Sequence, residues 1–201
     1  MILAFDTETT GFPDTQAPST AEHQPHLVQL GFVVLDDAGR EVSSCDVLVR
    51  PVGWTIPPRT TEIHGITTDH ALAEGLPLAE VVTMYRDAVR WTRARVAHNL
   101  AFDDRIMRIA MCRAGVSRDE IEALEARPSY CTKLLAHNHV KAPPTARMLA
   151  AGRTHHKAPN LGECVRHFFG QEHAGAHNGL ADARACGRVY HHLRGLELAL
   201  V

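Results

Sequence analysis

Five side chains in three separate runs of the sequence have the types and spacing for chemistry. Asp6 and Glu8 are two residues apart, Asp103 lies near the middle of the chain, and His177 comes five positions before Asp182. On an extended chain, residues two apart leave the same face, so Asp6 and Glu8 can hold one hard cation between them. An imidazole ionises near neutral pH, so a histidine in a glycine-bearing loop suits proton transfer.

Each of these signals has a plainer explanation when it stands alone. An Asp-x-Glu pair is often solvated surface, although this pair follows an apolar run in which an unpaired negative charge would be costly without a metal. Asp103 lies in the first turn of an expected helix, where an acid stabilises the helix dipole, and we expect neighbouring Asp104 to do only that. The chain has 14 histidines, so His177 stands out only by its place before Asp182.

The elements expected to position these residues are strands in antiparallel order, followed by strands that alternate with helices. This order predicts an α/β fold with a mixed sheet flanked by helices, and it puts the carboxylates at strand ends or helix starts. We expect strands over residues 2–5, 26–35, 41–50, 95–98 and 130–133, and helices over 78–91, 101–114, 160–169 and 180–194. Pro51, Pro57 and Pro58 predict a loop after residue 50, and three further prolines predict a loop or an irregular insertion over 141–159.

Length and composition bound the class of protein. The 201 residues predict one domain over 1–201, and 45% apolar with 22% charged residues argues against disorder and against a membrane span. The net charge of −2 gives no excess of basic residues that would announce nucleic-acid binding. Five scattered cysteines and an opening that reads as a core strand, not as a targeting segment, lead us to expect a cytoplasmic protein.

Taken together, the runs 6–11, 98–103 and 177–182 resemble the three motifs of the DEDD exonuclease superfamily, histidine subclass. This superfamily includes polymerase proofreading subunits, oligoribonuclease and ribonuclease T. The resemblance extends from Ile2 to about Arg194 and is supported by the runs 63–67 and 160–161. It implies a ribonuclease H-like fold with a five-stranded mixed sheet, and a 3′-to-5′ exonuclease activity.

The resemblance also implies roles for individual residues. Asp6, Glu8, Asp103 and Asp182 would hold two divalent cations, Mg²⁺ or Mn²⁺, while His177 would deprotonate the attacking water. Four carboxylates that repel one another have no physical reason to stand together without metal, which favours an enzyme over a noncatalytic module of the same fold that binds strand ends or a polymerase.

Substrate contacts are also implied by the resemblance. Thr7 and Thr9 would lie along the terminal nucleotide, and His64 and Phe102 would line the base pocket, although packing explains Phe102 equally well. The resemblance favours single-stranded DNA as substrate, with short RNA as the alternative, and it leaves a polymerase partner and a homodimer open. The basic segment 141–157 could follow a bound strand or be a solvated loop. His137-Asn138-His139 is interpreted as chance.

Overall fold

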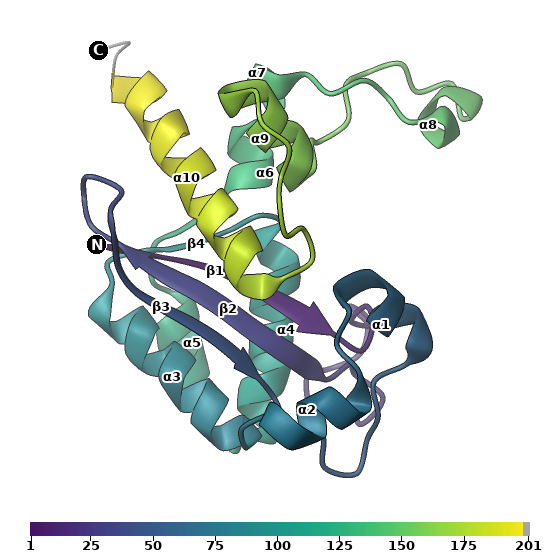
Figure 1. The fold of residues 1–201 in the computed structure, drawn as a ribbon, viewed down its shortest axis with the longest axis vertical. Coiled ribbons are helices and arrows are strands. Elements are labelled where there is room, and N and C mark those ends of the chain that lie inside the picture. The colour runs from purple at the N-terminus through teal and green to yellow at the C-terminus, as the bar shows by residue number, and fades with distance from the viewer. Residues whose placement is uncertain (199–201) are drawn as a thin grey trace.

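A five-stranded mixed sheet forms the centre of the described protein. The computed structural model describes residues 1–198, and the last three residues of the expected domain lie outside that range. The strands are β1 (Ile2–Thr9), β2 (Leu27–Leu35), β3 (Glu41–Leu48), β4 (Arg95–Ala97) and β5 (Ser129–Cys131). Their order is β3-β2-β1-β4-β5, antiparallel from β1 to β3 and parallel from β1 to β5 (Figure 1). The predicted mixed sheet is therefore confirmed.

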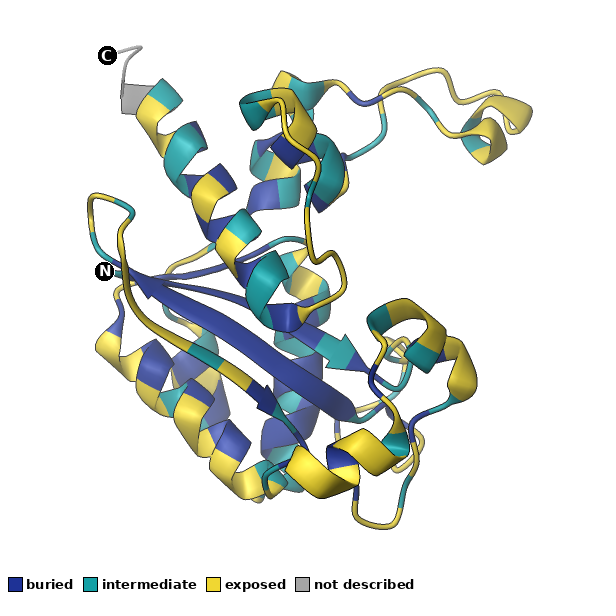
Figure 2. Ribbon diagram, viewed as in Figure 1, coloured by how far each residue is buried: buried dark blue, intermediate teal, exposed yellow. Residues whose placement is uncertain are grey.

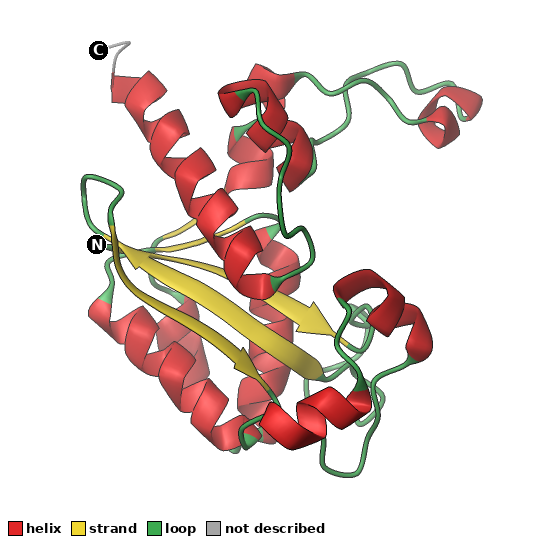
Figure 3. Cartoon of the chain, viewed as in Figure 1, coloured by secondary structure: helices red, strands yellow, loops and turns green. Residues whose placement is uncertain are grey.

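Helices cover both faces of this sheet (Figure 3). One face carries α3 (Leu78–Trp91), α4 (Leu100–Arg113) and α5 (Arg118–Glu125), and the other carries α9 (Leu161–Phe169) and α10 (Gly179–Leu198). The short helices α6 (Thr132–Leu135) and α7 (His137–Val140) lie beside α9 on the second face. Figure 2 shows β1 and β2 mostly buried between helices whose outer surfaces are exposed, whereas most of the edge strand β3 is exposed. None of the helices described is long and apolar enough to cross a bilayer.

The side chains of β1 point alternately to the two faces of the sheet, and this decides which of its residues face α4 and which face α10. Leu3 and Phe5 pack into the core beneath α3 and α4, whereas Ile2 and Ala4 pack against α9 and α10. Successive residues of a strand point to opposite faces. The even positions 6 and 8 therefore face α10, and position 7 faces α4.

Several elements differ from the sequence-based expectations. β1 was expected to end at Phe5, but it continues to Thr9 because its pairing with β2 persists, with Asp6 opposite Gly31. The proline-rich stretch after β3 was expected to be a loop, yet it contains α1 (Pro58–His64) and α2 (Thr68–Glu74). Pro58 stands at the first helical position of α1, where a missing N–H costs nothing.

The segment expected to be a loop over 141–159 is mostly irregular but holds one short helix, α8 (Ala146–Ala150). Figure 1 shows α8 at the end of a long connection that stands off the rest of the molecule. We call residues 141–157 the basic arm. The predicted helix start at Asn160 is confirmed, because Asn160 and Glu163 exchange both hydrogen bonds of a capping box at the start of α9.

Candidate active site

Asp6 and Glu8 lie on the same face of β1, inside the strand instead of beyond its end. Their cross-strand partners in β2 are Gly31 and Gln29. Both side chains are partly exposed, and Asp6 is more enclosed by protein than Glu8. The pair therefore lies near the end of the central strand of the sheet.

Asp103 reaches the same end of β1 from the first turn of α4. Its Oδ1 accepts hydrogen bonds from the Thr7 backbone N–H at 3.1 Å and from the Thr7 hydroxyl at 2.8 Å. Thr7 is the β1 residue that faces α4, so the strand itself fixes this carboxylate. Because both bonds go to Oδ1, the other oxygen of Asp103 has no hydrogen bond from Thr7.

Asp182 is brought in by a close approach between β2 and the start of α10. A Cβ on Gly31 would lie 2.0 Å from the carbonyl carbon of Gly179, so only glycine fits at this crossing. The Gly179 N–H also donates to Gln29 Oε1 at 2.9 Å. These contacts hold the first turn of α10 above the Asp6 face of the sheet.

Two histidines contact Asp182, and only one of them was singled out from the sequence. The backbone N–H of His177 donates to Asp182 Oδ2 at 3.1 Å, and His177 has a left-handed φ of 66°. The Nε2 of His173 contacts Asp182 Oδ1 in an ion-pair geometry, and the His173 side chain is only 9% exposed. No sequence signal separated His173 from the other histidines, because its position nine residues before Asp182 matches no motif.

The carboxylates repel one another, and no lysine or arginine of the described residues lies in an ion pair with them. Burial raises the pKa of Asp6 well above its usual range, and the charges of Asp103 and Asp182 raise it further. Burial also raises the pKa of Glu8 to about 9, with added repulsion from Asp6 and Asp182. The pKa of Asp103 is raised by burial, against the lowering effect of the Thr7 hydrogen bonds. No lysine or arginine in the described residues forms an ion pair with any of the four.

This donor set fits divalent cations. One ligand atom each from Glu8, His177 and Asp182 lies within 4.8 Å of the other two. Asp6 and Asp103 are close enough to raise each other's proton affinity, and oxygen-rich sites of this kind favour Mg²⁺ or Mn²⁺. A cleft of about 330 Å³ opens beside them, lined by Asn160, His173, His177 and Asp182 among others.

The residues expected to contact substrate are placed differently from one another. Thr7 is buried and gives both its N–H and its hydroxyl to Asp103, so neither group is free for a nucleotide. The Thr9 hydroxyl donates to Gly11 O at 2.7 Å and shapes the loop after β1. His64 lies near His177, and burial, together with that neighbour, lowers its pKa.

Phe102 is half-buried and forms an edge-to-face pair with Phe12, with ring centroids 6.0 Å apart. Phe12 is 89% exposed, which is unusual for a phenylalanine on a protein surface. Sequence reasoning missed Phe12, although its place directly after Gly11 in the first motif could have drawn attention to it. The two rings give the site an aromatic border.

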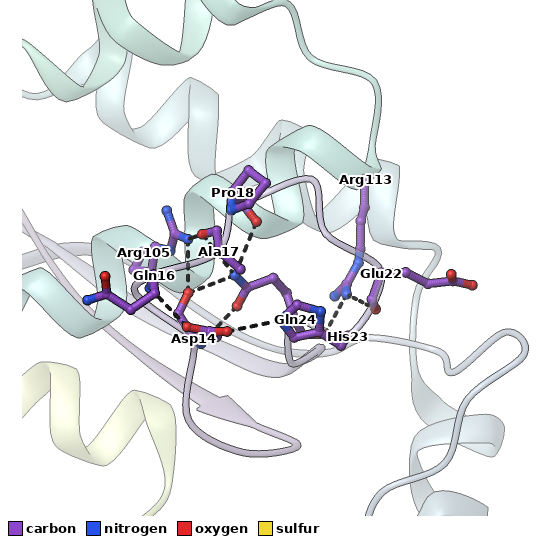
Figure 4. Close-up of polar contacts among 9 residues, drawn as sticks. All are labelled: Asp14, Gln16, Ala17, Pro18, Glu22, His23, Gln24, Arg105 and Arg113. Carbon is purple, nitrogen blue, oxygen red and sulfur yellow. Dashed lines mark hydrogen bonds and ion pairs between the residues drawn. The ribbon is translucent and has the colours of Figure 1, made fainter.

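The loop that carries Phe12, residues 10–26, is tightly fixed to α4 (Figure 4). Gln24, only 2% exposed, accepts from Asp14 N–H and donates to the Asp14 carbonyl at 2.8 Å. Arg105 donates to the Ala17 carbonyl and to the Ser19 hydroxyl. Figure 4 also shows Arg113, which donates to the carbonyls of residues 22, 24 and 25. Hydrogen bonds within the loop and with two arginines of α4 thus hold the loop in place.

Asp104 has a use that the sequence did not reveal. It forms an ion pair with Arg95, a β4 side chain that is 2% exposed and also donates to the Glu125 carbonyl at 3.1 Å. The expectation that Asp104 only stabilises a helix dipole is wrong. Two adjacent acids of α4 therefore differ: Asp104 is paired with an arginine, whereas Asp103 has no lysine or arginine partner among the described residues.

Comparison with known proteins places this geometry in a family. The family model for exonucleases of the RNase_T type matches residues 3–190. No curated protein matches the chain by sequence. Among solved structures, Escherichia coli Exonuclease I in complex with a dT13 oligonucleotide is similar over 99% of this chain and 42% of that chain, with a TM-score of 0.76 and 18% identity.

Two further solved structures are similar in the same way. Exonuclease I from Methylocaldum szegediense matches with a TM-score of 0.72 at 20% identity, over 96% of this chain and 40% of that one. The zinc-bound form of the E. coli Exonuclease I complex with single-stranded DNA matches with a TM-score of 0.71 at 16% identity. The match covers 98% of this chain and 41% of that one. This chain thus spans about two fifths of their length, and identities this low establish a shared fold. Because the family model covers nearly all of it, the chain belongs to the RNase_T exonuclease family.

Proposed function

We propose that this chain is a divalent-metal-dependent 3′-to-5′ exonuclease that acts on single-stranded DNA, and that residues 1–201 form one exonuclease domain. The observation that carries the proposal is the cluster of Asp6, Glu8, Asp103 and Asp182 near the end of the central strand β1, with no lysine or arginine paired to any of them among the described residues. A buried cluster of like charges is costly unless something external neutralises it. Divalent cations meet that requirement, and once bound they would attract the negatively charged phosphodiester.

In this proposal the four carboxylates hold the cations, and the protein fixes each carboxylate in advance. Bound divalent cations would supply positive charge against the phosphate oxygens and make the attacking water more acidic. The Thr7 hydroxyl donates a hydrogen bond to Asp103, and the His177 backbone N–H donates one to Asp182. The side chains therefore need little rearrangement to act as ligands.

His177 is proposed as the group that accepts the proton of the attacking water. Its side chain is exposed at the mouth of the cleft, within ligand distance of Glu8 and Asp182. A left-handed φ at a non-glycine residue costs about 1 kcal/mol, and strain of this kind concentrates at functional sites. His173 is proposed to orient Asp182 through its contact with Oδ1.

Single-stranded DNA is the preferred substrate because two of the similar structures hold single-stranded oligonucleotides. The exposed Phe12 and its partner Phe102 offer an aromatic border on which unpaired bases could stack. Short RNA remains the second candidate, because the same carboxylate chemistry cuts either backbone and only contacts with the 2′-hydroxyl tell them apart.

The test is hydrolysis of 5′-labelled oligo(dT), the matching RNA and a duplex, each with Mg²⁺, Mn²⁺ or EDTA. The expected result is a metal-dependent ladder that shortens from the 3′ end, most rapidly on single-stranded DNA. The variant Asp6→Asn should abolish the ladder, whereas Asp37→Asn, which changes an exposed acid in the turn between β2 and β3, should leave it intact.

Other outcomes separate the alternatives. A faster ladder on RNA would move the substrate to the second candidate. If no strand shortens under any metal while the folded protein still binds oligonucleotides, the noncatalytic module is correct and the enzyme proposal fails.

A further inference from the structure

The basic arm, residues 141–157, differs in charge from the rest of the chain. It contains Lys141, Arg147, Arg153 and Lys157 and no aspartate or glutamate, whereas the whole chain has a net charge of −2. The remainder of the chain is therefore acidic. Because the chain as a whole is acidic, its net charge does not explain this basic segment. A local group of cations of this kind indicates a specific anionic partner.

Three of these cations have no partner among residues 1–198. The side chains of Lys141, Arg147 and Arg153 make no hydrogen bond or ion pair with any residue in the range 1–198. Among the described residues outside the arm, most lysines and arginines have a side-chain partner, and Arg50 and Arg59 are the exceptions. Arg105 and Arg113 donate to backbone carbonyls, and Arg166 and Arg184 form ion pairs with glutamates. The arm thus keeps its charge available to a ligand.

The arm stands on a fixed base. The Lys157 N–H donates to the Ala142 carbonyl at 3.0 Å and closes the arm at its foot, and the Lys157 ammonium pairs with Glu163. Just beyond, the Pro159 carbonyl accepts from His98 Nε2 at 3.2 Å. His98 directly follows β4 and opens the segment that leads to Asp103. The foot of the arm is therefore bonded to the strand end that positions the site.

The arm also continues the cleft. The cleft of about 330 Å³ that holds His177 and Asp182 is lined on its other side by Asn160, Leu161 and Gly162, the residues that follow the arm. Figure 2 shows the arm as almost wholly exposed. A strand that leaves this cleft past residues 160–162 runs toward the base of the arm.

We propose that the basic arm binds the sugar-phosphate backbone of the single strand, on the 5′ side of the nucleotide that is removed. This inference rests on the proposed function and assigns a strand-holding surface to it. Lysine ammonium and arginine guanidinium groups on an open surface bind phosphates well, and such contacts do not depend on base sequence. The arm would therefore raise affinity for long strands without changing the bond-breaking step.

The test measures binding without hydrolysis. A 5′-fluorescein oligo(dT) of about 20 nucleotides is titrated with protein in EDTA at several salt concentrations, and anisotropy reports the affinity. The triple variant Lys141→Gln, Arg147→Gln, Arg153→Gln should bind at least about tenfold more weakly at low salt. Each lost phosphate contact lowers the slope of log affinity against log salt by about 0.7 on single strands, so the slope should fall by about two.

A matched control removes the same charge elsewhere. Arg40, Arg93 and Arg118 are exposed arginines in surface ion pairs, on the turn between β2 and β3 and around α3 and α5, and their change to glutamine also removes three positive charges. This control should keep the wild-type salt slope. If both triple variants lose affinity equally, or if the arm variant binds as the wild type does, the arm is a solvated loop and the proposal is overturned.

Hydrolysis separates failure of the arm from failure of the function. The arm variant should cut a trinucleotide at the wild-type kcat/KM and lose at least about tenfold in kcat/KM on the long strand, mainly through KM. Equal loss on both lengths would mean damage to the site and would reject the arm as a remote contact. A wild-type protein that cuts neither length would reject the proposed function itself, and the arm would then be judged by the anisotropy result.

Discussion

Asp103 and Asp104 are neighbours in the first turn of α4, yet they lie in opposite electrostatic surroundings. Asp104 meets Arg95, a buried cation from β4, and burial raises its pKa against the pull of that arginine. Asp103 points to the β1 carboxylates and receives only two hydrogen bonds from Thr7. The two aspartates show that one buried acid is neutralised inside the protein, whereas its neighbour has no such partner among the described residues, which is the basis for proposing it as a metal ligand.

The same rule separates two larger regions. On the face covered by α3 and α5, Glu120 pairs with Arg86 and Arg90, and Glu125 pairs with Arg108. On the face covered by α10, the acids of β1 have no lysine or arginine partner within residues 1–198. One face is thus neutralised by the protein's own residues, and the other is left with a negative charge that suits metal binding.

The largest effect that tests this contrast comes from Asp103→Asn. The asparagine carbonyl can still accept from Thr7, but the charge needed for a cation is gone. We expect activity on single-stranded DNA to fall by roughly a thousandfold or more. Unfolding in EDTA should show stability unchanged or raised by about 1 kcal/mol, because repulsion with Asp6 is relieved. Retention of more than a tenth of the activity would remove Asp103 from the site.

The matched change at the next position should do the reverse. Asp104→Asn leaves the Arg95 guanidinium buried beside Tyr85 without a counter-ion. We expect a loss of about 3–5 kcal/mol in the free energy of unfolding, measured by urea denaturation. Activity per folded molecule should stay near that of the wild type at low temperature.

A second change guards this prediction against simple misfolding. Adding Arg95→Met to Asp104→Asn removes the stranded charge and should recover part of the lost stability. If the double variant is no more stable than Asp104→Asn, the ion pair is not the source of the loss, and the contrast with Asp103 collapses.

Asp103 and Asp104 also show which features of the structure could be predicted from the sequence and which could not. The apolar run of β1, the capping box at Asn160 and the spacing of α3 and α4 follow from local periodicity and were predicted from it. Which of two adjacent aspartates faces β1 depends on the rotation of α4 against the sheet, and this rotation is set by packing across residues far apart in the chain. Local patterns carry no such information.

The missed site neighbours have the same cause. His173 contacts Asp182 across a loop whose end, at Gly179, lies against Gly31 and Gln29 of β2, about 150 residues away in the sequence. Arg95 reads as an ordinary strand residue until α4 delivers Asp104 to it. The short helices α1 and α2 were hidden by prolines that usually mark loops.

Metal removal gives the next largest effect. Mg²⁺ or Mn²⁺ at a hundred times its dissociation constant should stabilise the folded wild type by about 2.7 kcal/mol, since unfolded carboxylates do not form the site. For a chain of this length that corresponds to a rise in Tm of about 5–10 °C. The rise should disappear in Asp103→Asn and persist in the Asp104→Asn, Arg95→Met double variant. An equal rise in all three would show that the cation binds elsewhere.

A third kind of buried group, His98, has hydrogen bonds but no counter-ion and gives the smallest effect. Its Nε2 donates to the Pro159 carbonyl, so its Nδ1 accepts from the Thr132 hydroxyl at 2.9 Å. Burial lowers the pKa of His98 to about 4. Below pH 6.5 the unfolded chain takes up a proton that the folded protein refuses, so stability falls as pH drops from 6.5 to 4 and levels off below that range.

Urea unfolding across this pH range measures the effect. His98→Gln keeps a donor and an acceptor but cannot titrate, so its stability should fall by about 2 kcal/mol less than that of the wild type between pH 6.5 and 4. The exposed His70→Gln is the control and should follow the wild-type curve. Parallel curves for His98→Gln and wild type would mean that the folded protein accepts the proton, and that a buried group here needs no charged partner to ionise.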